Sequence, residues 1–179
     1  MSIATKKGDD GSTGLMYNRR VSKCHPRVEA YACVDELNSA LGMARATAAH
    51  DFISEKILTI QKDLVNLMGE LATAVEDLER YAKDGFKSIS NEATAQLDGW
   101  VLEIEAQNIT YKGWATPGAT VHSAALDIAR ATCRRAERRV CSLQADDQLR
   151  NTEIIVYLNR LSDLLWLFAR WVETQTADS

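Results

Sequence analysis

Residues 53–78 read ISEKILTIQKDLVNLMGELATAVEDL, and they form the most regular stretch of this sequence. Its apolar residues recur in steps of four and three, at positions 53, 57, 60, 64, 67, 71, 75 and 78. Such steps place apolar side chains along one face of an α-helix. We therefore expect a helix over residues 53–78 whose apolar stripe packs against other helices.

Four further segments have the same periodicity. The first spans 26 to about 47 and begins at Pro26, a residue that fits the first turn of a helix. The next spans about 90–104, with Ser90 as its expected N-cap. The last two span about 120–144 and about 152–173, and Asn151 is the expected cap of the final one. Five helices with short connections predict an all-α fold, a five-helix antiparallel bundle.

Length and composition agree with one soluble helical domain. The chain has 179 residues, and one core usually serves roughly 100–200. Two prolines and nine glycines are too few for the frequent turns of an all-β domain. No apolar run reaches the roughly 18 residues of a membrane span, and the first residues carry no secretory signal. We expect residues 1–25 to form an N-terminal loop and residues 26–174 the bundle, in a cytoplasmic protein with reduced cysteines.

The formal net charge of −4 hides a strong separation of charge. Residues 1–27 hold six Lys or Arg against two Asp, and residues 130–139 hold five Arg against one Glu. The remaining residues carry 10 basic and 22 acidic side chains. An acidic body with two basic segments indicates a specific anion site. It argues against a nucleic-acid-binding surface, because a domain with such a surface is usually basic overall.

The first candidate for that site is the segment TKKGDDGSTG, residues 5–14. Its glycines let backbone N–H groups converge on an anion, and its lysines and hydroxyls add further donors. It is not a Walker A loop, because the order G-x-x-x-x-G-K-[ST] is absent. Such a composition is also typical of a flexible terminus, and that alternative stays open.

The second candidate is the arginine-rich helix expected at residues 120–144. Arg130, Arg134 and Arg138 recur every four residues, so they share one helical face with Glu137. The planar guanidinium group stays charged and suits phosphate oxygens. The alternative is a solvated basic face that is paired with acidic neighbours.

Two polar clusters on other helices could complete the site. Asn159, Ser162 and Asp163 form a polar seam beside the apolar stripe of the last helix, where interhelix hydrogen bonds are the alternative role. Asp35 is flanked by stripe residues and needs a cationic partner, for which the arginine helix is the obvious source. The three histidines are scattered and no Glu-x-x-His pair occurs, so no metal site is expected in the bundle.

Four motifs together resemble the PduO-type ATP:cob(I)alamin adenosyltransferases, also called corrinoid adenosyltransferases. They are, in order, TKKGDDGSTG at 5–14; RVSK at 20–23 followed by RVEAYACVDELN at 27–38; ARATCRRAER at 129–138; and YLNRLSD at 157–163. The motifs extend over nearly the whole chain. Each alone is moderately specific, whereas all four in this order are highly specific.

The resemblance implies transfer of the 5′-deoxyadenosyl group of ATP to the cobalt of cob(I)alamin, which forms adenosylcobalamin and triphosphate. It also implies a homotrimer with active sites between subunits, and Mg²⁺ that accompanies the ATP. The catalytic residues that it implies are Arg134 and Arg138 at the phosphates, and Asp35 paired with Arg130 across the interface. The other residues implied at the nucleotide are Thr5, Lys6, Lys7, Gly8, Thr13, Gly14, Lys23, Arg135, Glu137 and Asn159.

Trp114 stands where the family carries an aromatic residue near the corrin ring, and the resemblance implies that it displaces the lower axial ligand of cobalt. Co(I) is itself the nucleophile in this reaction, so no side chain has to attack. The absence of a recognisable catalytic triad agrees with that chemistry. Two other interpretations remain open. One is a non-catalytic protein that binds nucleotide or corrinoid, and the other is a structural bundle whose arginine face binds an acidic protein.

Overall fold

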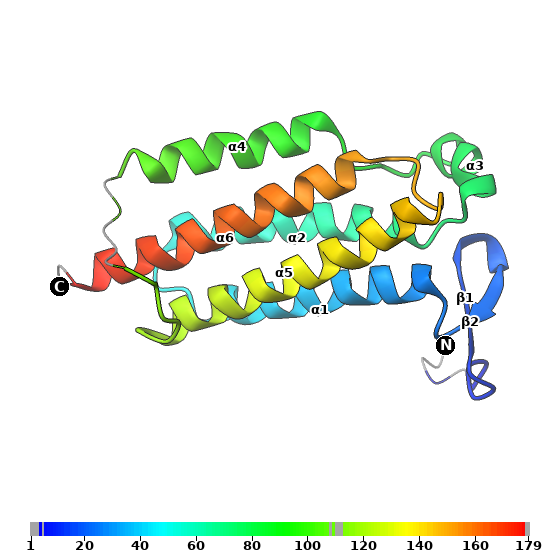
Figure 1. Ribbon diagram of the computed structural model, residues 1–179, viewed down its shortest axis with the longest axis horizontal. Coiled ribbons are helices and arrows are strands. Elements are labelled where there is room, and N and C mark those ends of the chain that lie inside the picture. The colour runs from blue at the N-terminus through cyan, green and yellow to red at the C-terminus, as the bar shows by residue number, and fades with distance from the viewer. Residues whose placement is uncertain (1–3, 5, 108, 110–112, 178–179) are drawn as a thin grey trace.

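The computed structural model describes residues 4, 6–107, 109 and 113–177, and these fold into six α-helices and one two-stranded hairpin. The helices are α1 Pro26–Ala46, α2 Asp51–Leu71, α3 Leu78–Lys83, α4 Asn91–Glu105, α5 Val121–Ala145 and α6 Glu153–Ala177. Helix α1 packs on α2 and α5, and α6 packs on α5 and α4 (Figure 1). None of the described helices combines the length and apolar composition needed to cross a membrane.

The hydrophobic core lies between the long helices, and the stripe of α2 is central to it. All six stripe residues from Ile53 to Leu71 are buried. Leu37 and Leu41 of α1 and Val140 of α5 are fully buried in the same cluster, as is Leu158 of α6. The expected stripes and the mainly helical class are thus confirmed.

The second helix is shorter than expected, and this changes the helix count. Helix α2 ends at Leu71, and a 3₁₀ turn over Val75–Asp77 leads into the six-residue helix α3. The carbonyls at the end of α2 have other partners: Leu71 O accepts from Arg27 Nη1, and Ala72 O accepts from the backbone N–H of Met16. Because these contacts satisfy the helix end, the expectation of a helix to Leu78 and of five helices is corrected to six among the described residues.

The other helix ends follow their sequence signals closely. Pro26 is the first residue of α1, and His25 Nδ1 accepts a hydrogen bond from Arg27 N at 3.1 Å. Asn151 Oδ1 accepts from Glu153 N at 3.1 Å, so it caps α6 as expected. Ser90 precedes α4 as expected, but its side chain makes no capping hydrogen bond.

The N-terminal segment contains a short hairpin where only a loop was expected. Strands β1 Ser12–Gly14 and β2 Arg20–Ser22 pair in antiparallel register, with Thr13 opposite Val21. The connection includes Tyr17 at φ 61° and Asn18 at φ 60°. Strands of three residues are too short to show an alternating pattern, so the sequence held no signal for them.

The hairpin is fixed to the segment around α3 by polar contacts (Figure 1). Arg19 donates two hydrogen bonds to the carboxylate of Asp77, and Nη2 lies 3.1 Å from Oδ1. Tyr17 donates its hydroxyl to Asp84 Oδ2 at 3.0 Å, and the Arg80 guanidinium lies 4.2 Å from the Tyr17 ring centroid. Arg19 also holds the pKa of Asp77 below its usual value. The break after α2 therefore creates the surface that holds the hairpin.

Replacing Leu64 by alanine should lower the free energy of unfolding by about 2–5 kcal/mol, because the side chain is fully buried and a cavity would remain. The adjacent Val65 is 59% exposed, so Val65→Ala should change stability by about 0.5 kcal/mol or less. Urea unfolding followed by circular dichroism measures both. Equal losses for the two variants would contradict the assignment of the buried stripe.

Asp77→Asn should loosen the hairpin without unfolding the bundle, because a neutral amide binds the Arg19 guanidinium more weakly than a carboxylate does. Limited trypsin digestion should then cut after Arg19, Arg20 or Lys23 several-fold faster than in the parent protein. The matched control is Asp147→Asn, which removes an exposed aspartate paired with Arg150. Unchanged cleavage in Asp77→Asn would show that the contact does not anchor the hairpin.

Candidate active site

The arginines of α5 fall into two rows with different partners. Arg135 forms an ion pair with Glu36 of α1, and Arg139 Nε lies 3.2 Å from Glu29 Oε1. This row is neutralised by the neighbouring helix and ties α5 to α1. The alternative of a basic face paired with acidic neighbours is therefore correct for these two arginines.

The other row keeps its charge available. Arg134 and Arg138 are exposed, and no carboxylate pairs with either among the described residues. Arg138 Nη1 donates to the backbone carbonyl of Arg134 at 3.0 Å, so the two side chains lie on adjacent turns of one face. Two exposed guanidinium groups without carboxylate partners form a site suited to an anion with several oxygens.

Helix α6 brings the polar seam to this row. Asn159 Nδ2 donates to Glu137 Oε1 at 3.2 Å, and Ser162 Oγ donates to the carbonyl of Asn159 at 2.9 Å. Beneath them Cys133 is fully buried and its Sγ lies 3.2 Å from Leu158 O; burial raises the pKa of this thiol far above its usual value. Cys133 is therefore held as a neutral thiol and is no nucleophile.

The N-terminal segment places a lysine over a glycine. A β-carbon at Gly8 would meet Lys23 Cε and Nζ at 3.2 Å, so Lys23 lies directly against the backbone of Gly8. Lys6 and Lys7 precede this contact and are exposed. Of the residues expected at the nucleotide, Thr13 and Gly14 belong to β1, and Thr5 lies outside the described residues.

A cavity of about 440 Å³ joins this segment to the C-terminal part of α5. Lys23, Glu29 and Arg139 contribute the charged side chains of its wall, and Ser142 and Asp146 complete the α5 side. The cavity therefore brings the basic N-terminal segment and the basic helix together at one end of the bundle.

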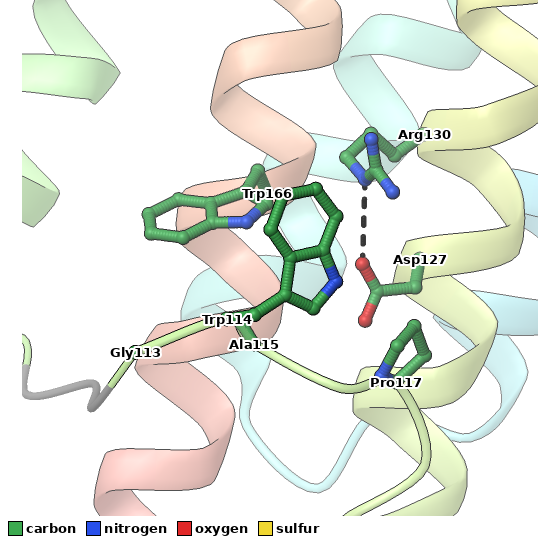
Figure 2. Close-up of a pocket in the computed structure, with 7 residues that line it drawn as sticks. All are labelled: Gly113, Trp114, Ala115, Pro117, Asp127, Arg130 and Trp166. Atoms are coloured by element: carbon green, nitrogen blue, oxygen red, sulfur yellow. Dashed lines mark hydrogen bonds and ion pairs between the residues drawn. The ribbon is translucent and has the colours of Figure 1, made fainter.

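A second cavity, of about 300 Å³, lies at the other end of α5 (Figure 2). Trp114 and Pro117 line it from the connector before α5, Arg130 lines it from α5, and Trp166 lines it from α6. Trp114 is 92% exposed, so it stands at the mouth of this cavity without being packed into the core. We call this the tryptophan cavity.

Two side chains of the tryptophan cavity, Trp166 and Asp127, were not predicted from the sequence. Trp166 is seven residues after Asn159, so it continues the face of the polar seam, and this spacing was the available signal. Asp127 is three residues before Arg130, a spacing at which opposite charges meet on a helix. Asp127 Oδ1 accepts from Arg130 Nε at 3.3 Å.

Some expected partners are not brought together within one chain. Asp35 is exposed on α1 and forms no ion pair with Arg130 among the described residues. The two cavities also lie apart, because their nearest wall residues on α5, Arg130 and Arg139, are separated by about 13 Å of helix. The N-terminal segment and the tryptophan cavity of one chain therefore do not face each other.

Comparison with known proteins gives one consistent result. The sequence model of a family described as cobalamin adenosyltransferase matches residues 3–172. The corrinoid adenosyltransferase of Bacillus subtilis is 34% identical over 180 residues, which cover 98% of this chain and 89% of that protein. The corrinoid adenosyltransferase PduO of Salmonella typhimurium is 36% identical over 173 residues. This chain spans about half of its length, 49%.

Solved structures give the same result. A variant PduO-type ATP:corrinoid adenosyltransferase from Lactobacillus reuteri, complexed with cobalamin and ATP, is similar to this chain with a TM-score of 0.88 and 32% identity. The match covers 98% of this chain and 96% of that one. An arginine-to-lysine variant from the same organism, complexed with ATP, has a TM-score of 0.87 and 29% identity. Together with the site geometry, these matches show that the chain belongs to the cobalamin adenosyltransferase family.

Proposed function

We propose that this chain is a corrinoid adenosyltransferase that uses ATP to adenosylate cob(I)alamin. The observation that carries the proposal is the similarity, over 98% of the chain, to a structure that holds both cobalamin and ATP. In the reaction a bond forms between cobalt and C5′ of ATP, the C5′–O bond breaks, and triphosphate leaves with the bond electrons. The described residues support this chemistry because they offer an anion site. The reaction itself requires no nucleophilic side chain.

The nucleotide is proposed to bind between the N-terminal segment and the arginine row. Lys6, Lys7 and Lys23 supply positive charge around the glycines at 8 and 14, and Arg134 and Arg138 supply uncompensated guanidinium groups. As the triphosphate leaves, these preorganised groups stabilise its growing charge. The remaining proposed contacts are Thr5, Thr13, Arg135, Glu137 and Asn159.

Three of these contacts are limited by the ion pairs and hydrogen bonds that the structure records. Arg135 is bound to Glu36, so it reaches a phosphate only if that ion pair opens. Asn159 and Glu137 already hold each other, which leaves the Asn159 carbonyl oxygen and one Glu137 oxygen for the nucleotide. Mg²⁺ is proposed to arrive with ATP and to be held mainly by phosphate oxygens and water, as is usual for this ion.

The corrinoid is proposed to occupy the tryptophan cavity. Trp114 offers an aromatic ring with no strong donor atom toward the metal, and its exposure leaves it accessible to a flat ligand. In this position the ring replaces the lower axial ligand of cobalt, which favours reduction to Co(I). Trp166 supplies a second aromatic wall from α6.

A homotrimer with sites between subunits is proposed from the arrangement of these parts. One chain separates its two cavities by about 13 Å of helix between Arg130 and Arg139, and we propose that a second copy brings its N-terminal segment to the tryptophan cavity. Val121 and Ile128 of α5 and Met43 of α1 are 74%, 62% and 61% exposed, and such apolar exposure marks contact surfaces. Asp35 lies exposed on α1 and is proposed to pair with Arg130 of a neighbouring copy. We place the enzyme in the cytoplasm, with no nucleic acid or membrane as partner.

Incubation with ATP, Mg²⁺ and chemically reduced cobalamin should yield adenosylcobalamin, which is followed by its absorption spectrum. Arg134→Ala should lower kcat by about 100-fold, because a charge-assisted contact to the leaving phosphates is lost. The control is Arg150→Ala, which removes an exposed arginine that pairs with Asp147. No product from the parent protein would refute the function, whereas full activity in Arg134→Ala would refute only the role of this residue.

Sedimentation velocity at micromolar concentration should give the mass of three chains. Asp35→Asn should raise KM for cobalamin or lower turnover about tenfold, because the proposed partner Arg130 loses a charged acceptor. Glu55→Gln on α2 removes another exposed carboxylate and should have neither effect. A monomeric parent protein would overturn the trimer, and a normal KM and turnover in Asp35→Asn would overturn the pairing.

A further inference from the structure

Beneath the tryptophan cavity lies a buried ion-pair chain that the reaction chemistry does not use. Arg170 of α6 is 1% exposed, and its Nη2 donates to Asp127 Oδ2 at 2.6 Å. Asp127 is 5% exposed and accepts from Arg130 Nε through its other oxygen, at 3.3 Å. The chain thus runs from a buried arginine, through one carboxylate, to an arginine in the cavity wall.

Arg170 also supports the wall of the tryptophan cavity that Trp166 forms. Its guanidinium carbon lies 5.8 Å from the ring centroid of Trp166, within the range of a cation–π contact. It is bound to Glu173 as well, with Nη2 3.1 Å from Oε1. A buried arginine is expensive to desolvate, so its place between two walls of one cavity calls for an explanation beyond general packing.

The contact between Asp127 and Arg130 uses one particular edge of the guanidinium. Asp127 accepts from Nε, and the two terminal amino groups of Arg130 donate no hydrogen bond among the described residues. The Arg130 side chain is 28% exposed, so these amino groups remain within reach of a ligand or a second chain. A carboxylate on Nε therefore fixes the plane of the group while its terminal donors stay available.

We propose that Asp127, anchored by Arg170, is a positioning residue that holds Arg130 in the orientation needed at the corrinoid site. The inference rests on the proposed function, because it names a residue that acts through Arg130 on corrinoid binding. Asp127 itself touches no reacting atom. Both of its oxygens are taken by arginines, so its influence on the ligand passes through the Arg130 guanidinium.

The test is a double-mutant cycle between Asp127→Asn and Arg130→Ala in the full chain. Asp127→Asn should raise KM for cob(I)alamin about tenfold and leave KM for ATP within about twofold, because one charge-assisted contact to Arg130 is weakened. In the Arg130→Ala background, Asp127→Asn should cause no further rise, because the residue on which it acts is gone. The control Glu173→Gln removes the other carboxylate of Arg170 and should keep KM for cob(I)alamin within twofold.

Asp127→Asn leaves Arg170 buried with one carboxylate fewer, so the variant could fail to fold for that reason alone. The double variant Asp127→Asn/Arg170→Met then carries the test, since it removes both charges of the buried pair, and Glu173, which loses its arginine, is 22% exposed to water. It should show the same tenfold rise. A KM for cob(I)alamin like that of the parent protein would overturn the positioning role. An equal rise of this KM on Asp127→Asn with Arg130 present and with Arg130→Ala would overturn it as well. A parent protein that makes no adenosylcobalamin would instead overturn the proposed function.

Discussion

The distribution of carboxylates around the arginines of α5 is the constraint on which the site depends. Five arginines within ten residues repel one another, so each one that is left without a partner costs stability. Glu36 and Glu29 of α1 neutralise Arg135 and Arg139, and this pairing also joins the two helices. Asp127 of the same helix pairs with Arg130, and the remaining charge, on Arg134 and Arg138, falls on one face. The fold therefore leaves an anion site by withholding partners from particular positions.

The same helix keeps the two halves of the proposed chemistry apart. Its N-terminal turns carry the tryptophan cavity, and its C-terminal turns meet the basic N-terminal segment. Since the cobalt and C5′ must come within bonding distance, this separation is the reason for proposing that two copies of the chain contribute to one site. Separate elements then fix each half: the 3₁₀ turn before α3 holds the hairpin through Asp77, and Arg170 supports the walls of the cavity.

The sequence predicts what depends on local periodicity and misses what depends on distant partners. The buried stripe of α2, the start of α1 at Pro26 and the cap at Asn151 are local, and they were predicted correctly. The end of α2 was not, because the partners of its carbonyls come from Arg27 and from the hairpin backbone, far away in the sequence. The arginine row was found from its spacing. The division of that helix between paired and unpaired arginines needed the position of α1.

Trp114 shows how function can account for an unfavourable feature of the free chain. A large aromatic ring that is 92% exposed gains little from burial when the chain folds. The ring stands over a cavity whose other walls are Trp166 and Arg130, so a flat apolar ligand would cover both tryptophans at once. At the proposed corrinoid site, the favourable free energy of removing these rings from water would be released on ligand binding instead of on folding. Part of it would offset the cost of taking the lower ligand away from cobalt, the step that we propose makes the metal reducible.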